Sequence, residues 1–236
     1  MAPFAVARAK SLSAITAVSL KPDFLARIAE RRDQLRRDLA ALLPSPRPIA
    51  WEIGSGHGHF LVRYAAEHPE KFCLGVDIQI ERIERANKKR DHARLPNCHF
   101  VRAEAREVLH ALPAGVTLAE VWILFPDPWP KARHNKNRLL RPEFLEDLAA
   151  RAGEGTPLYF RTDHTEYFRE AEASIRAATT WRINPSAPWP MEHETVFQAR
   201  APAYHSLVAL RTTHPARPTA AVAPGLPPLT TPTSPA

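Results

Sequence analysis

The sequence predicts a single α/β domain built on a mainly parallel β-sheet with helices on both faces. Short apolar runs alternate with amphipathic or charged segments along most of the 236 residues, which is the pattern of strands alternating with helices. A glycine-rich turn follows the first of these runs. Acidic residues stand at the ends of the next two, where open parallel sheets bind their ligands.

The first predicted element is a helix over residues 22–43. Apolar residues recur there at the spacing of one helical face, and arginines occupy the opposite face. The proline-rich stretch 44–48 then ends the helix. Residues 1–21 are interpreted as a flexible N-terminal segment. Residues 214–236, rich in Pro, Ala and Thr, are expected to be a disordered tail because they bury too little apolar surface to offset the entropy of ordering. The domain is therefore assigned to residues 22–213.

Strands and helices alternate from residue 49 to residue 211. Each strand is a short apolar run, and each helix is a longer stretch with charged residues on one side. Pro142 suits the first turn of its helix because its φ angle is already helical. The predicted strands are 49–53, 72–78, 98–103, 119–125, 156–162, 180–184 and 204–211, and the predicted helices are 58–67, 79–93, 105–112, 141–152 and 164–178.

The composition indicates the general class of protein but does not identify its binding partner. Hydrophobic residues make up 44% and charged residues 24%, as in ordinary globular domains. No apolar run approaches the roughly 18 residues of a membrane helix, so we expect a soluble, cytoplasmic protein without a membrane partner. The two cysteines lack the spacing of a metal site. The formal net charge of +7 favours polyanions, but charge alone leaves nucleic-acid binding open.

The first predicted strand runs into the turn EIGSGHG at 52–58. Gly54, Gly56 and Gly58 allow a sharp turn and a close approach of backbone amides to a ligand. Their spacing differs from the G-x-G-x-x-G of pyrophosphate sites, and the carboxylate of Glu52 would repel a pyrophosphate. That carboxylate suits the ammonium group of S-adenosyl-L-methionine, which we infer to be the cofactor.

Two further acids follow the next two strands. Asp77 ends the second predicted strand, where a carboxylate can accept both ribose hydroxyls of a nucleoside. Glu104 follows the third strand, within reach of an adenine edge. Each acid alone could be a capping or ion-pairing group. The order of strand, acid, glycines and second acid favours a methyltransferase.

The fourth predicted strand ends in FPDPWPK at 125–131. The flanking prolines stiffen Asp127, which is expected to face the group that receives the methyl. Between Asp127 and Glu143 there are five Lys or Arg residues and no acid. Beside an active site, such a stretch indicates a loop that contacts phosphates, although a solvated charge run is the usual alternative. The candidate RNA contacts in this loop are Lys131, Arg133, Lys136 and Arg138.

The run FPDPWPKARHNK at 125–136, together with EIGSGHG, resembles the TrmB family of tRNA (guanine-N7-)-methyltransferases. The resemblance covers about residues 48–211. RTDHTEY at 161–167 is similar to the family's Thr-Asp-x-x-x-Tyr segment, and ETVFQAR at 194–200 to its Thr-Lys-Phe-Glu motif. In the second motif Val196 replaces the usual Lys and Gln198 the usual Glu. Both departures lie on the substrate side.

The resemblance implies a Rossmann-like class I methyltransferase with a mostly parallel seven-stranded sheet. It implies methylation of guanine N7 in the variable loop of tRNA (position 46). The sequence gives no sign of a partner chain, so we expect a monomer or a homodimer. Asp127 is the implied catalytic residue. The implied cofactor pocket comprises Glu52, Gly54, Gly56, Gly58, Asp77, Glu104 and Asp127. The implied substrate contacts are Lys131, Asp163, Thr195, Phe197 and Gln198.

Two other functions stay open at this stage. Asp-Pro-Trp at 127–129 is similar to the Asp/Asn-Pro-Pro-aromatic motif of methyltransferases that act on exocyclic amino groups, but Trp129 takes the place of the second proline. A non-catalytic RNA-binding protein on a methyltransferase fold would accommodate the changes at Val196 and Gln198. The complete glycine turn and the three pocket acids argue against it.

Overall fold

The computed structural model describes residues 22–129, 133, 137–191 and 203–213. Its sheet has seven strands in the order β3-β2-β1-β4-β5-β7-β6. Neighbours among β1 to β5 pair in parallel, and β7 pairs antiparallel with both β5 and β6. The predicted fold class, a mostly parallel seven-stranded sheet, is confirmed. The strands are β1 Pro48–Ile53, β2 Phe72–Asp77, β3 Cys98–Arg102, β4 Thr117–Leu124, β5 Pro157–Thr162, β6 Trp181–Ile183 and β7 His205–Arg211.

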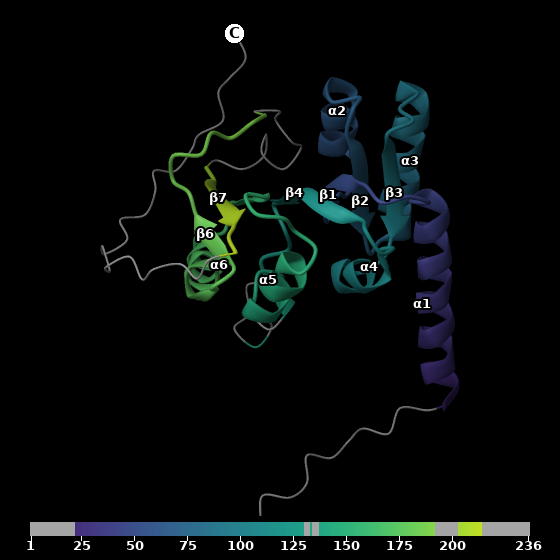
Figure 1. Cartoon of the computed structure of the whole chain (residues 1–236), viewed down its shortest axis with the longest axis horizontal. Coiled ribbons are helices and arrows are strands. Elements are labelled where there is room, and N and C mark those ends of the chain that lie inside the picture. Colours follow the sequence, from purple (N-terminus) through teal and green to yellow (C-terminus); the bar gives the residue numbers. More distant parts are fainter. Residues whose placement is uncertain (1–21, 130–132, 134–136, 192–202, 214–236) are drawn as a thin grey trace, which may run out of the picture.

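Helices cover both faces of the sheet (Figure 1). In the view of Figure 1, α2 and α3 lie above the sheet, and α4, α5 and α6 lie below it. One cluster of buried side chains joins the sheet to α1, α4, α5 and α6, and a second joins it to α2 and α3. The helices are α1 Pro22–Leu42, α2 His59–Glu67, α3 Ile80–Ala93, α4 Ala105–Ala111, α5 Pro142–Ala149 and α6 Thr165–Ala177. Among the described residues, no helix has the length and apolar character needed to cross a membrane.

Only the C-terminal half of α1 buries its apolar face against the domain. Leu35, Leu39 and Leu43 are buried in the core, where α1 packs beside α4. Phe24 and Leu25, which the sequence pattern placed on the same apolar face, are 50% and 49% exposed. Figure 1 shows the reason: the first turns of α1 extend below α4, beyond the rest of the domain.

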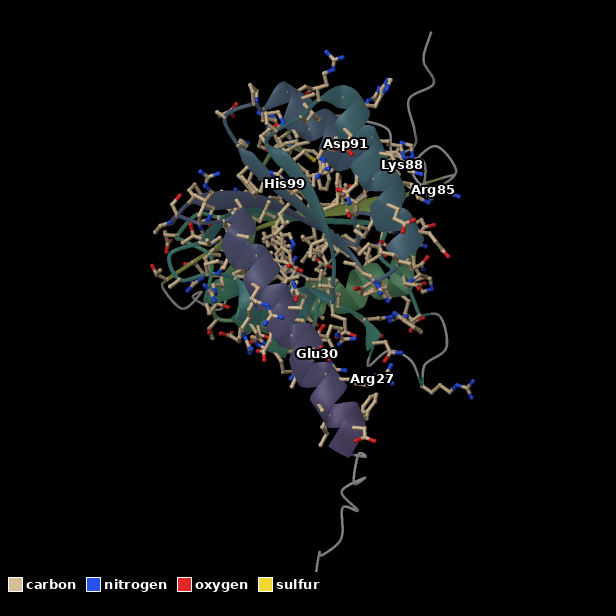
Figure 2. All side chains as sticks on the ribbon, turned by 90° about the vertical axis from the view of Figure 1, so that its right-hand side faces the viewer. Arg27, Glu30, Arg85, Lys88, Asp91 and His99 are labelled. Carbon is tan, nitrogen blue, oxygen red and sulfur yellow. The ribbon has the colours of Figure 1, made fainter. Side chains whose placement is uncertain are left out.

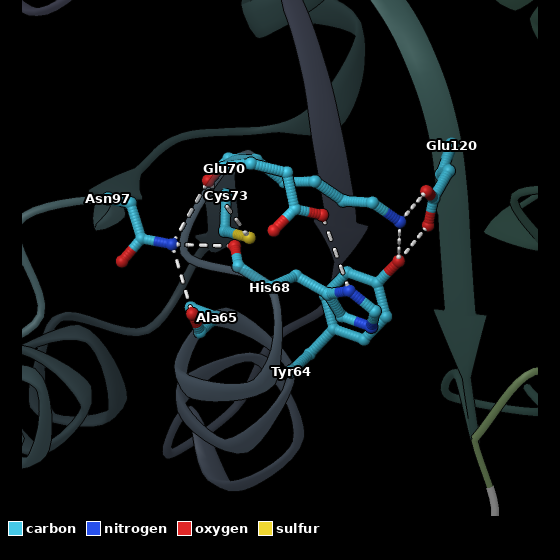
Figure 3. Close-up of polar contacts among 8 residues, drawn as sticks. Tyr64, Ala65, His68, Glu70, Cys73, Asn97 and Glu120 are labelled. Atoms are coloured by element: carbon cyan, nitrogen blue, oxygen red, sulfur yellow. Dashed lines mark hydrogen bonds and ion pairs between the residues drawn. The ribbon is translucent and has the colours of Figure 1, made fainter.

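A polar cluster fastens α2 to the sheet (Figure 3). The ammonium of Lys71 forms an ion pair with Glu120 of β4 and lies 2.6 Å from the hydroxyl of Tyr64, which itself donates to Glu120. The side-chain amide of Asn97 donates to the carbonyls of Ala65, His68 and Lys71, each at 3.0 Å. Burial, together with Glu120, raises the pKa of Tyr64. These bonds hold α2 in place and therefore fix the turn that precedes it.

The strand order reverses direction between β1 and β4, both of which lie at the centre of the sheet. Open α/β sheets bind ligands at such a reversal, outside the carboxyl ends of the strands. The turn after β1 and the loop after β4 therefore face each other across the expected site.

Candidate active site

The turn between β1 and α2 depends on glycine in two different ways. Gly54, Gly56 and Gly58 all have positive φ angles, of 73°, 53° and 72°, which side chains strain to adopt. The amides of Gly54 and Ser55 both donate to the carbonyl of Val76 at 2.9 Å. The turn is thereby tied to β2.

Gly58 has a packing role that the sequence did not indicate. A Cβ there would lie 2.7 Å from the Cζ of Phe100 and 2.8 Å from the Cβ of Ala86. Gly54 and Gly56 line the cavity described below, whereas Gly58 is not among its described lining residues. Gly58 therefore lets α2 approach β3 and α3 closely, and the predicted cofactor contact at this residue stays a prediction.

Asp77 organises the loop that follows β2. Its carboxylate accepts hydrogen bonds from the amides of Gly56 at 3.1 Å and Gln79 at 2.9 Å. The guanidinium of Arg82 lies 3.4 Å from the same carboxylate. Each carboxylate oxygen has two lone pairs, so capacity remains for ligand hydroxyls. Asp77 is thus both an anchor of the glycine turn and a cavity-lining acid.

Glu52 is a buried acid without a full set of partners. It is 4% exposed, and its Oε2 has no hydrogen-bond partner among the described residues. Burial raises the pKa of Glu52, the charge of Asp77 raises it further, and a backbone hydrogen bond from Leu61 acts in the opposite direction. A buried polar group without a partner is costly, and a cationic ligand group would satisfy it. The hydroxyl of Ser55, also buried and without a partner in the described chain, lies in the same wall. Both groups fit the ammonium end of S-adenosylmethionine.

A cavity of about 990 Å³ opens at the carboxyl ends of β1, β2, β3 and β4. This volume suits a ligand the size of a nucleoside cofactor. Glu104 lines it from the N-terminal end of α4 and forms no capping bond with its side chain, which leaves the carboxylate for a ligand. The lining includes Glu52, Gly54, Gly56, Asp77, Glu104 and Asp127.

The loop after β4 forms the opposite wall. Phe125 and Trp129 bracket it, with positive φ angles of 48° and 47°. Such angles are uncommon in bulky residues and tend to occur at functional sites. Between them, Asp127 is exposed and lines the cavity, as does Trp129. The strained loop therefore presents an acid and an indole to the same cavity as Glu52 and Asp77.

Arg138 is buried rather than free to meet RNA. It is 3% exposed. Its Nε donates to the carbonyl of Pro128 at 2.8 Å, its Nη1 lies 2.5 Å from a carboxylate oxygen of Glu170, and its guanidinium stands 5.2 Å from the ring centre of Tyr167. Its burial argues against a phosphate contact at this residue, which lines the cavity and connects the Asp127 loop to α6.

The remaining substrate candidates are placed unevenly. Arg133 and Asp163 are exposed, and neither is among the described residues that line the cavity. Asp163 lies directly after β5, beside His164, whose Nδ1 accepts from the amide of Tyr167 at 3.2 Å and so caps α6. The candidates outside the described residues are Lys131, Lys136, Thr195, Phe197 and Gln198.

Several lining residues were missed by sequence reasoning. Ser55 and Arg82 follow the predicted motifs closely and could have been inferred from their positions. Asn137 and Arg141 reach the cavity from the segment before α5, and Glu143 from the first turn of α5; the basic stretch had marked that segment for phosphate contacts and not for the cavity. Among the described residues, no group of His, Cys, Asp or Glu is arranged to hold a metal ion.

Taken together, the strand order and the acid-lined cavity at the turn after β1 define the fold and site of a class I methyltransferase of the S-adenosylmethionine-dependent type. Two solved structures share the fold. The aminoglycoside resistance methyltransferase NpmB1 is 18% identical, with a TM-score of 0.51 over 75% of this chain and 93% of that one. TrmN from Thermus thermophilus is 15% identical, with a TM-score of 0.50 over 75% of this chain and 48% of that one.

Sequence comparison identifies the family. Residues 46–205 match the family model described as "Putative methyltransferase". The tRNA (guanine-N(7)-)-methyltransferase of Treponema pallidum (strain Nichols) is 37% identical over 75% of this chain and 73% of its own length. The protein of the same name from Synechococcus sp. (strain JA-2-3B'a(2-13)) is 42% identical over 54% of this chain and 53% of its own length, so that match spans about half of that relative. This chain belongs to the TrmB family, as the motifs predicted.

Proposed function

We propose that this protein transfers a methyl group from S-adenosylmethionine to N7 of a guanine in tRNA, with the variable-loop guanine at position 46 as the expected target. The observation that carries the proposal is that Asp127 and Trp129 line the same cavity as Glu52 and Asp77. One wall thus suits a cationic nucleoside cofactor, and the other offers an acid and a flat ring to a nucleobase. We expect the protein to act in the cytoplasm, where tRNA is abundant.

Methylation of guanine N7 depends on the positioning of the base and the cofactor and requires no proton transfer from the attacking nitrogen. Guanine N7 carries a lone pair in the plane of its ring, so the attacking atom has no proton to lose. When bound, the cofactor supplies the methyl group as an electrophile. Glu52 and Ser55 would hold its ammonium end, Asp77 its ribose hydroxyls and Glu104 its adenine edge.

Asp127 then acts on the base. A carboxylate there can accept hydrogen bonds from the guanine edge and stabilise the positive charge that the ring acquires on methylation. The second acid, Asp163, is a substrate contact in this proposal. Trp129 offers a surface on which a base can stack. Alignment of the reacting atoms by such contacts can contribute several kcal/mol, up to roughly 7–11.

The test is methyl transfer from labelled cofactor into unmodified tRNA transcript, followed by identification of the methylated nucleoside. We expect 7-methylguanosine. Replacing Asp127 with Ala should lower kcat/KM by at least about 10²–10³-fold, while Asp38→Asn, which changes an exposed acid on α1, should leave it unaltered.

Three outcomes would contradict parts of the proposal. A methyl group on an exocyclic amine would replace N7 by an amino-group target. Cofactor binding without transfer to any tRNA would favour an RNA-binding protein. Wild-type turnover by the Asp127→Ala variant would remove this residue from the mechanism.

A further inference from the structure

A cluster of cations lies on α2 and α3, beside the glycine turn and away from the Asp127 loop. We name it the basic face. Figure 2 shows two of its members, Arg85 and Lys88, on α3. The basic face comprises Arg63 of α2 and Arg82, Arg85, Lys88 and Lys89 of α3.

Helical spacing and the cavity rim bring these cations together. Arg82, Arg85 and Lys89 are three and four residues apart, so they follow one side of α3. Burial lowers the pKa of His57 at the rim, and Arg85, Lys89 and Arg82 lower it further. The pKa of His59 is lowered by burial, then by Lys89, His57 and Arg63. The positive charge therefore converges on the edge of the cavity.

Much of this charge is not neutralised within the described chain. Arg82 approaches Asp77, and the Lys89 ammonium donates to the carbonyl of His57 at 2.9 Å. Arg63, Arg85 and Lys88 are exposed, and none of the three has a hydrogen bond or an ion pair among the described residues. Like charges this close repel one another, which an anionic partner would relieve.

Three acids share α3 with the basic face. Asp91 forms an ion pair with Arg90, while Glu81 and Glu84 are exposed and form no ion pair with a described residue. The four basic-face cations on α3 outnumber these two acids, so the side of α3 beside the cavity keeps an excess of positive charge. Arg82 to Lys89 covers about 10 Å of helix, a length over which a nucleic-acid strand presents several phosphates.

We propose that the basic face binds the phosphate backbone of the substrate RNA. The inference rests on the proposed function, which supplies the RNA and brings one of its bases to the cavity. Phosphates on α2 and α3 would hold the RNA on the far side of the cavity from the Asp127 loop. The backbone would thus be held at two separated surfaces while the target base enters between them.

The test replaces Arg63 and Arg85 together with Gln and measures RNA affinity as a function of salt. Each phosphate contact contributes about 0.9 to the slope of log affinity against log salt for a duplex. The double variant should therefore show a slope smaller by about 1.8 and an affinity about tenfold or more weaker near 0.1 M salt. Its kcat at saturating RNA and its affinity for S-adenosylmethionine should stay at the wild-type values.

The matched control is Arg27→Gln with Arg182→Gln. These arginines lie on α1 and β6, are exposed, and have no hydrogen bond or ion pair with a described residue. The control removes the same net charge away from the cavity. Its slope should equal the wild-type slope.

The outcomes separate this inference from the proposed function. An unaltered slope in the Arg63/Arg85 variant, or an equal loss in the control, overturns the basic face as a phosphate site. If the wild-type protein binds tRNA without methylating it, the proposed function is wrong. The salt slopes would still show whether the basic face binds phosphates. Wild-type protein that binds no RNA overturns both.

Discussion

Arg138 provides the sharpest test of the structure against the sequence, because the two assign it different roles. The sequence placed it in a loop that contacts RNA phosphates. In the structure its side chain is 2% exposed and joins the carbonyl of Pro128 to Glu170 of α6. We predict that Arg138→Gln impairs catalysis by releasing the Asp127 loop, with no loss of a phosphate contact.

The expected size follows from the bonds that are lost. The hydrogen bond from the charged Nε to Pro128 is worth about 1.5–3 kcal/mol. Loss of the ion pair adds little, since the side chain of Glu170 is 42% exposed and water can solvate it. If this energy holds the loop in its productive position, kcat/KM should fall about 10–150-fold, at about 1.4 kcal/mol per factor of ten.

The assay is steady-state methyl transfer into tRNA transcript, well below the unfolding temperature of each variant. The cofactor affinity and the salt slope of RNA binding should match those of the wild type, and Arg138→Lys should recover part of kcat. A control variant, Arg176→Gln, breaks an exposed ion pair with Glu172 on α6 and should remain fully active. If Arg138→Gln keeps the wild-type kcat at saturating RNA but loses about 0.9 from the salt slope, the phosphate role of Arg138 is correct and its role in holding the Asp127 loop is refuted.

Two further predictions concern the glycine turn and the buried acid. Gly58→Ala should destabilise the protein by about 2–5 kcal/mol in urea unfolding, from overpacking against Phe100 and from the positive φ. Gly155→Ala, with φ +79° and open space around it, should cost only about 1–2 kcal/mol, and equal losses would disprove the packing role. For Glu52, the raised pKa means that the folded state keeps its proton to higher pH than the unfolded state, so the stability of the ligand-free protein should fall as pH rises between the two pKa values. Cofactor binding should release this proton, measurable by calorimetry in buffers of different ionisation enthalpy, and identical proton release from the Glu52→Gln variant would exclude Glu52 as the source.

The strand and helix pattern could be predicted because the local spacing of apolar residues specifies it. Helix α3 was predicted within one residue at its start and correctly at its end, Ala93. Helix α5 was predicted to run to residue 152 but ends at Ala149. Its last residues lead into a bridge in which Ala152 pairs with Leu118. That pairing joins residues far apart along the chain, which no local pattern reports.

The sequence by itself determined the fold class, the family and the acids that line the cavity, because strand ends and turn glycines place those residues through local geometry. Only the tertiary structure decided the roles of Gly58 and Arg138. The local sequence around a turn glycine is the same whether the glycine contacts a ligand or packs against a neighbouring helix. The same holds for an arginine in a basic loop. Phe100 and Ala86 fill the space beside Gly58, and Pro128 and Glu170 surround Arg138. Those contacts come from elements that meet only when the sheet has formed.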